Sequence, residues 1–488
     1  SFALTLMATV AGCGGGGDSG AVDSSPATQV TGTAVLPQSL NQTAKQVLTE
    51  SPERRAAKSD ECPAVPDGYE PAAQARVDLV GSGGGIIAST TADSCGGFTL
   101  SATDSTQTVR VTAAGHQTIE VPVDAVSDNS VLSALPDGAR YEIAALQFVG
   151  LDKLSALIVD STTKKAVLGL LAGAISARVG DASIPITQVT SRGTALNSDP
   201  FSVTVVLDSS GSMTRCAANC PGDPGYTRDN PRFNRSQLVA KASHAFLDGK
   251  KGADETSLLA FSSRVYRLDD AFFADRFKDA AGTTTSYSIS ADGFTTDAAK
   301  LRLPVDFYNR SSLFWLASGD ALHPVTTSTG LVPSRRGYPL TGSTALYTAV
   351  VDGLNWIGTR TSQRRIVIAM SDGQNNAGSE TLESAIQSAQ AAGVPVYTIG
   401  YGLSQSNSSE ARAIESLQTL ASQTGAESTV VNGTDIVGLF AGLQTAIRFE
   451  TEVALGQALT PGQSVTLSVT TDSGTESSRE ATVPAASN

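Results

Sequence analysis

Three oxygen-bearing side chains follow a short apolar run near the middle of the chain. Asp208, Ser210 and Ser212 alternate in the sequence Asp-Ser-Ser-Gly-Ser. One carboxylate and two hydroxyls are hard oxygen donors of the kind that Mg²⁺ prefers. The run before them, 203–207, contains neither Gly nor Pro, which is typical of a strand buried on both faces of a parallel sheet. Because ligands of open α/β sheets bind at the carboxyl ends of the strands, we predict a divalent-cation site in this loop.

Two later loops contain further oxygen ligands in similar contexts. Thr344 lies in Gly-Ser-Thr-Ala-Leu, and Asp372 follows the apolar run 366–370 in Ser-Asp-Gly. With Asp-Ser-Ser-Gly-Ser, these motifs closely resemble the metal-ion-dependent adhesion site of von Willebrand factor type A (VWA) domains, although Ser343 replaces the second glycine of the family's GGTAL turn. The resemblance covers residues 201–447. It implies one divalent cation, Mg²⁺ with Mn²⁺ or Ca²⁺ as alternatives, held by Asp208, Ser210, Ser212, Thr344 and Asp372.

The resemblance also implies an activity. In that family the aspartates often act through water, so the cation keeps uncompensated positive charge and one open position. A glutamate or aspartate of a protein ligand fills that position, which means adhesion or protein binding and no catalysis. Two alternatives stay open: an envelope-assembly or scaffold protein with a structural metal site, and a metal-dependent hydrolase. The hydrolase would need a general base besides the two aspartates.

The elements expected around these loops alternate between strand and helix. Apolar residues recur at helical spacing in 238–246, 346–357, 382–389, 414–421 and 436–447, with strands between them. This pattern predicts a doubly wound, Rossmann-like α/β domain with a parallel sheet over 201–447. Residues 271–340 interrupt it and contain ten of the chain's 27 Phe, Tyr and Trp residues. We consider two interpretations of this insertion: a small self-packed subdomain, and an aromatic recognition surface near the metal.

All-β segments are expected on both sides of the α/β domain, so the chain is predicted to be multidomain. Residues 29–124 contain short alternating runs between Gly-rich turns, typical of a β-sandwich, and the polar stretch 39–70 is expected to be an insertion or long loop. The run 93–100 resembles the T-D-x-x-G-x-F-x-L signature of carboxypeptidase regulatory-like (transthyretin-like) domains, without its Thr. Residues 125–200 and 448–488 form either one further sandwich, interrupted by the α/β domain, or two separate β units.

The start of the chain resembles a bacterial lipoprotein signal. An apolar run leads into Val-Ala-Gly-Cys at 10–13, followed by a Gly-rich linker to residue 28. The resemblance implies that residues 1–13 are the remnant of the signal with its lipobox, and that Cys13 is acylated. It places the protein in the bacterial cell envelope, by analogy at the outer membrane, facing either the periplasm or the exterior.

The other four cysteines are an even number, which favours disulfides in an oxidising compartment. Cys216 and Cys220 are close enough to pair locally, and Cys62 would then pair with Cys95. The alternative is a zinc site, but no second cysteine cluster accompanies Cys-x-x-x-Cys and the three histidines are scattered.

The net charge and the hydropathy of the chain argue against a nucleic-acid partner and against a membrane-spanning helix. The 488-residue chain has a formal net charge of −13 and a pI of about 4.8, which argues against nucleic acid because phosphate binding needs a basic face. No run of eighteen or more apolar residues is present, so the given sequence predicts no membrane-spanning helix.

Overall fold

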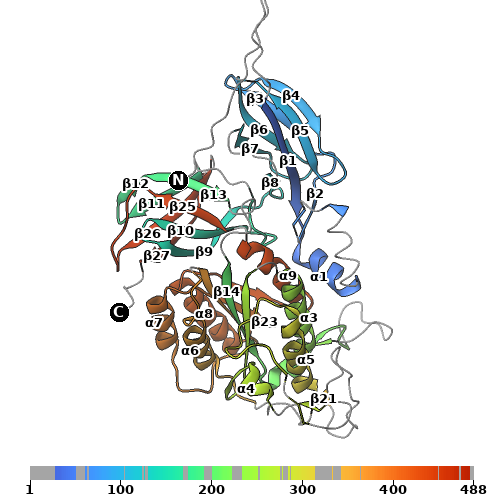
Figure 1. Cartoon of the computed structure of the whole chain (residues 1–488), viewed down its shortest axis with the longest axis vertical. Coiled ribbons are helices and arrows are strands. Elements are labelled where there is room, and N and C mark those ends of the chain that lie inside the picture. Colours follow the sequence, from blue (N-terminus) through green and yellow to red (C-terminus); the bar gives the residue numbers. More distant parts are fainter. Residues whose placement is uncertain are drawn as a thin grey trace, which may run out of the picture.

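The computed structural model shows an α/β domain and two β-sandwiches (Figure 1). It describes residues 28–488 apart from 51–60, 63–64, 67, 104, 124–125, 127–129, 169–173, 192–199, 222–232, 251–252, 275–276, 279–283, 286, 314–331, 334–341, 363, 449, 472–473 and 484–488. The expected signal, Cys13 and the Gly-rich linker up to residue 27 lie outside the described residues.

The first sandwich packs two four-stranded sheets around a core that includes Val77, Phe98 and Val109. One sheet contains β1 (Thr28–Pro37), β2 (Tyr69–Pro71), β5 (Gly97–Ala102) and β8 (Ser130–Ser133), and the other contains β3 (Arg76–Gly81), β4 (Ile86–Thr91), β6 (Thr106–Thr112) and β7 (Ile119–Pro122). Strand β8 lies beyond the expected boundary at residue 124. It pairs in parallel with β1 and buries Leu132 in this core, so the sandwich needs residues that the sequence pattern assigned to the next segment.

Part of the stretch expected to be a loop is a helix. Within 39–70, α1 (Leu40–Thr49) begins with a capping box in which the Ser39 side chain accepts from the Gln42 backbone N–H. Leu40, Val47 and Leu48 pack against the core of the α/β domain. Gly438 of helix α9 (Asp435–Arg448) permits this approach, because a Cβ there would collide with the Leu40 carbonyl. The prediction of a loop was therefore wrong for these residues, since it ignored apolar side chains at helical spacing.

The second sandwich contains strands from both sides of the α/β domain. Its sheets have the orders β13-β25-β10-β9 and β12-β11-β26-β27, and Leu154, Val453 and Leu467 contribute to their common core. The strands are β9 (Tyr141–Gly150), β10 (Lys153–Asp160), β11 (Ile175–Val179), β12 (Ala182–Ile184), β13 (Ile186–Ser191), β25 (Thr451–Leu455), β26 (Ser464–Thr471) and β27 (Gly474–Thr482). Because β25 pairs with both β10 and β13, the chain leaves this sandwich, forms the α/β domain and returns.

The α/β domain has a six-stranded sheet of order β18-β17-β14-β22-β23-β24, parallel except for β18. Its strands are β14 (Phe201–Asp208), β17 (Glu255–Phe261), β18 (Val265–Arg267), β22 (Arg364–Ser371), β23 (Val396–Tyr401) and β24 (Ser428–Val431). Every residue of β14 is buried, as expected for a central strand covered on both faces.

Helices cover both faces of this sheet (Figure 1). Side chains of α3 (Arg235–Asp248), α5 (Ala299–Leu313) and α9 (Asp435–Arg448) share one apolar core with Val203 and Val205 of β14. Those of α6 (Leu346–Ile357), α7 (Leu382–Ala392) and α8 (Ser408–Gln423) share the other core with Val206. The sheet is therefore doubly wound, and its loops at the carboxyl ends gather at one edge.

The amino ends of the parallel strands face the second sandwich. Arg364, the first residue of β22, forms an ion pair with Glu450 at 2.8 Å, and both side chains are buried. The Leu146 backbone N–H donates to the Gly425 carbonyl, just before β24, at 2.7 Å. The carboxyl ends of the strands consequently lie at the opposite end of the domain, away from both sandwiches (Figure 1).

The described part of the insertion joins the core of the α/β domain. It includes α4 (Asp270–Phe273), α5 and the short strands β19 (Phe277–Lys278), β20 (Thr284–Thr285) and β21 (Val332–Pro333). Phe273 and Tyr308 are fully buried in the α3–α9 layer, and Phe294 packs on Trp356 with ring centroids 5.2 Å apart. These aromatic side chains form neither a separate subdomain nor an exposed surface; several others of the insertion lie outside the described side chains.

Both predicted disulfides are confirmed. Cys62 pairs with Cys95 and Cys216 pairs with Cys220, with Cα atoms 5.3 and 5.9 Å apart, inside the usual range of about 4.4–6.8 Å. The second bridge closes the segment that contains β15 (Cys216–Ala218), which pairs with β16 (Phe233–Asn234) just before α3.

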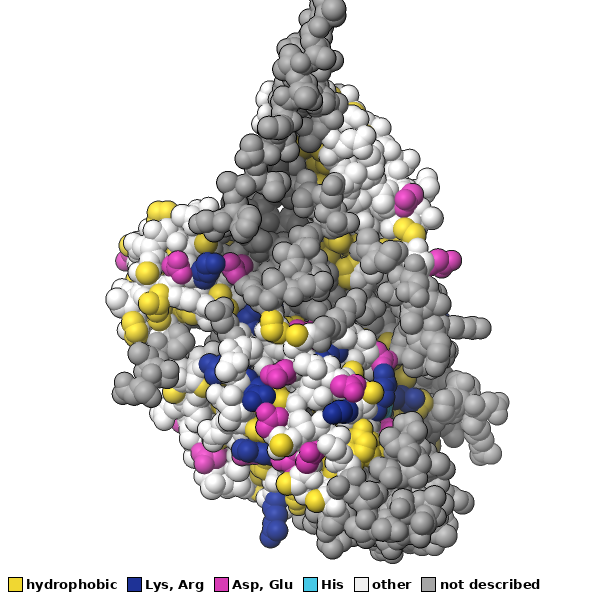
Figure 2. Space-filling view, in the orientation of Figure 1, with side chains coloured by type: hydrophobic (Ala, Val, Ile, Leu, Met, Phe, Trp, Pro, Cys, Tyr) yellow, Lys and Arg dark blue, Asp and Glu magenta, His cyan; other side chains and the backbone are white. Residues whose placement is uncertain are grey.

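The surface of the α/β domain has side chains of both charges. On the face in Figure 2, the acidic and basic side chains drawn over the α/β domain are interspersed. Over the residues described, no helix combines the length and the hydropathy that crossing a bilayer requires.

Candidate metal centre

The first loop of the candidate site is held closed by its own polar groups. Asp208 is the last residue of β14 and is fully buried. The Ser210 backbone N–H donates to Asp208 Oδ1 at 2.8 Å, and the Ser210 and Ser212 hydroxyls lie 2.9 Å apart. The chain then turns through a short 3-10 helix, Gly211–Thr214. Three oxygen donors are thereby directed into one small volume at the edge of the sheet.

The loop after β22 contacts this first loop directly. The Ser212 hydroxyl donates to Asp372 Oδ1 at 2.5 Å. The Ser371 hydroxyl donates to Asp208 Oδ2 at 2.7 Å. Four of the five residues predicted from the sequence, Asp208, Ser210, Ser212 and Asp372, thus form one hydrogen-bonded cluster, although up to 164 residues separate them in the chain.

Thr344 lies beside this cluster, at the turn leading into α6. Its backbone N–H donates to Asn376 Oδ1 at 2.7 Å, and the Asn376 N–H donates to the Thr344 carbonyl at 2.9 Å. These bonds fix Thr344 against the loop that follows Asp372. A Cβ built on Gly373 would lie 3.9 Å from Thr344 Oγ1, so this hydroxyl faces the same loop, and Thr344 is 3% exposed.

The electrostatics of the cluster favour a cation. Burial, and secondly the negative charge of Asp372, raise the pKa of Asp208 to about 7. Two acidic side chains that are 0% and 4% exposed therefore share a region where negative charge is poorly solvated. A divalent cation would offset that charge, and hydroxyl and carboxylate oxygens are the donors that Mg²⁺ accepts.

The donor set does not resemble that of a zinc site. Across the described residues, no group of three or more His, Cys, Asp and Glu side chains could hold a metal. The donors here are two carboxylates and three neutral hydroxyls, which suit a hard cation that keeps some of its waters. The residues present therefore fit Mg²⁺, with Ser210, Ser212 and Thr344 supplying hydroxyls.

Three side chains that the sequence analysis missed also contact this cluster. Ser371 fixes Asp208, as described above, and its place directly before Asp372 was a usable signal. The Tyr308 hydroxyl, from the insertion helix α5, donates to the Asp208 main-chain carbonyl at 2.5 Å. Arg235 Nη1 lies 2.6 Å from Asp372 Oδ2. No motif identifies Tyr308 or Arg235, because only the tertiary fold brings them to the edge of the sheet.

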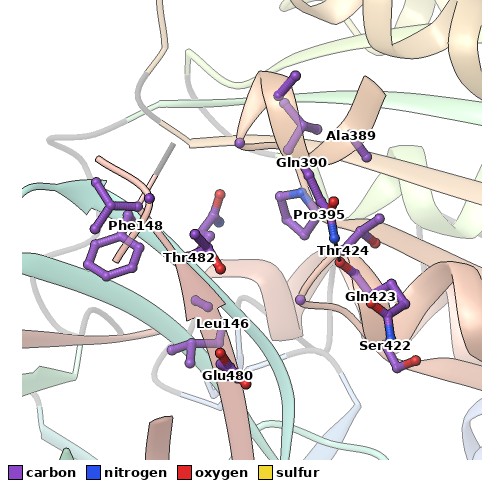
Figure 3. A pocket seen from close by; sticks show the side chains of 18 of the residues that line it. Leu146, Phe148, Ala389, Gln390, Pro395, Ser422, Gln423, Thr424, Glu480 and Thr482 are labelled. Carbon is purple, nitrogen blue, oxygen red and sulfur yellow. Dashed lines mark hydrogen bonds between the residues drawn. The ribbon is translucent and has the colours of Figure 1, made fainter. Parts of the chain in front are cut away.

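A separate cavity lies between the second sandwich and the α/β domain. Its volume is about 590 Å³, and among the described residues that line it Glu480 is the one charged side chain. Figure 3 shows Phe148 and Glu480 on the sandwich side and Pro395 and Gln423 on the α/β side. The cavity is at the amino edge of the sheet, whereas Asp208 and Asp372 are at the carboxyl edge, so the two sites are distinct.

Comparison with known proteins identifies one domain. The family model of the von Willebrand factor type A domain matches residues 337–441, which include Thr344 and Asp372. The chain therefore contains a VWA domain. No curated protein matches the chain.

Solved structures similar to the chain include three bacterial proteins. The vWF domain of the type V pili tip protein Mfa5 from Porphyromonas gingivalis is 13% identical, with 51% of this chain and 95% of that chain covered and a TM-score of 0.31. An aerotolerance-related membrane protein from Bacteroides fragilis is 13% identical over 50% of this chain and 98% of that chain, with a TM-score of 0.29. The PilB minor pilin from Streptococcus sanguinis is 13% identical over 77% and 88%, with a TM-score of 0.33.

Proposed function

We propose that this protein binds an acidic group of a protein partner through a divalent cation held in its VWA domain. The observation that carries the proposal is the hydrogen-bonded cluster of Asp208, Ser210, Ser212 and Asp372 at the carboxyl edge of the sheet. Thr344 completes the proposed ligand set, and Mg²⁺ is the cation that these oxygen donors fit best. The proposed activity is adhesion or protein–protein interaction and not catalysis.

The chain's own groups would hold the ligands in place. Ser371 and the Ser210 N–H fix the two carboxylate oxygens of Asp208. Ser212 and Arg235 fix those of Asp372. When bound, the cation would supply a Lewis-acidic position for a carboxylate oxygen of the partner. Because the surrounding groups are already oriented, little conformational entropy is lost when the partner binds.

The candidate site lies at the end of the α/β domain that points away from the sandwiches, where a partner protein could reach it. The parallel strands point their carboxyl ends away from both sandwiches (Figure 1), and the second sandwich contacts the opposite end of the α/β domain. We include in the proposal that the sandwiches separate the VWA domain from a lipid anchor at Cys13, in the bacterial cell envelope and by analogy at the outer membrane. Mass spectrometry of the protein expressed in a bacterial host should then find an acylated Cys13, and an unmodified, uncleaved N-terminal segment would contradict the anchor.

Affinity capture tests the proposed function. Wild-type protein and Asp372→Asn are used as baits on envelope extracts, each with Mg²⁺ and with EDTA. We expect a partner that wild type retains only with Mg²⁺ and that Asp372→Asn does not retain. Exposed Asp181 lies in the β11–β12 turn of the second sandwich, outside the sheet that carries the candidate site, so Asp181→Asn is the matched control. A partner retained equally in EDTA would instead support a scaffold whose metal site is structural.

A further inference from the structure

Arg235 is built into the candidate metal centre although it is not a cation ligand. Its Nη1 donates to Asp372 Oδ2 at 2.6 Å and its Nη2 donates to the Gly402 carbonyl at 2.9 Å. The side chain of Asp372 is 0% exposed and that of Arg235 is 12% exposed. A paired charge so well shielded from water acts more strongly on its surroundings than a surface ion pair does.

The backbone around Arg235 is shaped to hold the guanidinium. Gly402 has a φ of +68°, and a Cβ there would lie 2.5 Å from Nη2 and 2.6 Å from Cζ. Only glycine therefore permits this arrangement without displacing the arginine. Arg235 itself is the first residue of α3, and its position is fixed by a capping box between Asn234 and Gln237. The guanidinium is thus placed by two independent elements.

The formal charges of the site show what this arginine changes. Asp208, Asp372 and Arg235 sum to −1, so a bound divalent cation leaves the site at +1. Without the guanidinium, the same cation would leave the site neutral. The attraction of the site for a cation would rise, whereas its attraction for a partner's carboxylate would fall, because both are Coulomb interactions with the same few groups.

We infer that Arg235 is a specificity-determining residue that weakens cation binding in order to keep the loaded site attractive to an anionic group of the partner. The inference rests on the proposed function and deepens it. The partner group it selects is a single carboxylate, whose charge of −1 neutralises the loaded site. Arg235 also occupies Asp372 Oδ2, so that Oδ1, which accepts from Ser212, is the oxygen that faces the cluster.

The test compares wild type with Arg235→Gln and Arg235→Lys, and uses Arg412→Gln as a matched control. Arg412 is exposed, and its Nε donates to the Ser408 carbonyl in α8. Mn²⁺ binding is measured by electron paramagnetic resonance, alone and with a pentapeptide that has one central glutamate. A pentapeptide with glutamine in its place gives the baseline. Thermal unfolding in EDTA provides a readout that needs no cation.

We expect Arg235→Gln to bind Mn²⁺ about tenfold more tightly than wild type, because removing one nearby, partly buried positive charge changes the affinity for a cation by about this factor. The factor by which the glutamate peptide tightens Mn²⁺ binding should fall toward one. In EDTA the variant should unfold at a lower temperature, because buried Asp372 loses its counter-charge. Arg235→Lys should resemble wild type in Mn²⁺ affinity, and Arg412→Gln should match wild type in every measurement.

The outcomes separate this inference from the proposed function. If wild type binds no Mn²⁺ with either peptide, the metal site itself is wrong. If wild type binds Mn²⁺ but Arg235→Gln binds it equally or more weakly, the inference is overturned and the metal site stands. Weaker binding by Arg235→Gln and Arg235→Lys alike would show that the arginine acts by positioning Asp372 and not by its charge.

Discussion

Replacing Asp208 by asparagine should have opposite effects on stability and on metal binding. Burial raises the pKa of Asp208 from 3.8 to about 7, so the metal-free protein at pH 8 holds an ionised carboxylate in an unfavourable place. A difference of about three pKa units corresponds to at most about 4 kcal/mol of unfolding free energy. Asparagine has no charge and can still accept from the Ser210 N–H. We therefore expect Asp208→Asn to be more stable than wild type by about 1–3 kcal/mol at pH 8 in EDTA.

The sign of this effect fixes its pH dependence. A carboxyl group whose pKa is higher in the folded state destabilises the fold where it is ionised, so the penalty is full above pH 7 and disappears toward pH 4. Metal-free wild type should thus gain stability relative to Asp208→Asn as the pH falls from 8 to 5. With Mg²⁺ at pH 8 the wild type should be stabilised and the variant should not.

Urea denaturation followed by circular dichroism measures these differences. The wild type, Asp208→Asn and the exposed control Asp181→Asn are compared at pH 5 and pH 8, in EDTA and in Mg²⁺. The reasoning is refuted if Asp208→Asn is less stable than wild type in EDTA at pH 8. It is equally refuted if the difference between the two proteins is the same at both pH values, since a titrating carboxylate cannot produce that result.

Three further predictions concern groups around the site and the sandwich contact. Arg364→Met should destabilise the fold by about 3–5 kcal/mol in urea denaturation, because the buried Glu450 carboxylate would lose its ion-pair partner. The double variant with Glu450→Gln should recover part of this loss of stability. Additive losses from the two substitutions would show that Arg364 and Glu450 are not coupled. Gly402→Ala should tighten Mn²⁺ binding, as Arg235→Gln does, since the new Cβ displaces the guanidinium. An unchanged Mn²⁺ affinity would mean that other groups can hold the arginine in place. Burial raises the pKa of Glu427 to about 7, so its ionised form destabilises the fold above that pH, and the melting temperature of wild type in EDTA should rise as the pH falls from 7 to 5. Glu427→Gln should remove part of that rise. An equal change of melting temperature with pH in both proteins would contradict this prediction.

The sequence could predict that these side chains meet at one edge of the sheet because their motifs are local. Asp208, Ser210 and Ser212 directly follow a buried strand, and Asp372 directly follows another, so parallel pairing alone brings them to one edge. Their role as cation ligands stays a prediction. The cysteine pairing was also predictable, because a four-residue separation at Cys216–Cys220 leaves one remaining pair.

What the sequence could not predict depends on long-range packing. Arg235 reaches Asp372 across 137 residues, and Tyr308 reaches Asp208 across 100, without any pattern in the chain that specifies either contact. Helix α1 was missed because charged and polar residues outnumber its few apolar ones. The pairing of β25 with β10 and β13 was left open, since alternation identifies a strand but not its neighbours.

Anomalous scattering from a crystal soaked in Mn²⁺ would locate the proposed cation. We predict one strong peak at the carboxyl edge of the sheet, within coordination distance of the Ser210 and Ser212 hydroxyl oxygens, with Thr344 and the two aspartates around it. The peak should be absent from crystals of Asp208→Asn soaked in the same way. A wild-type crystal with no peak at this edge, or with its strongest peak elsewhere, would show that these residues do not form the cation site.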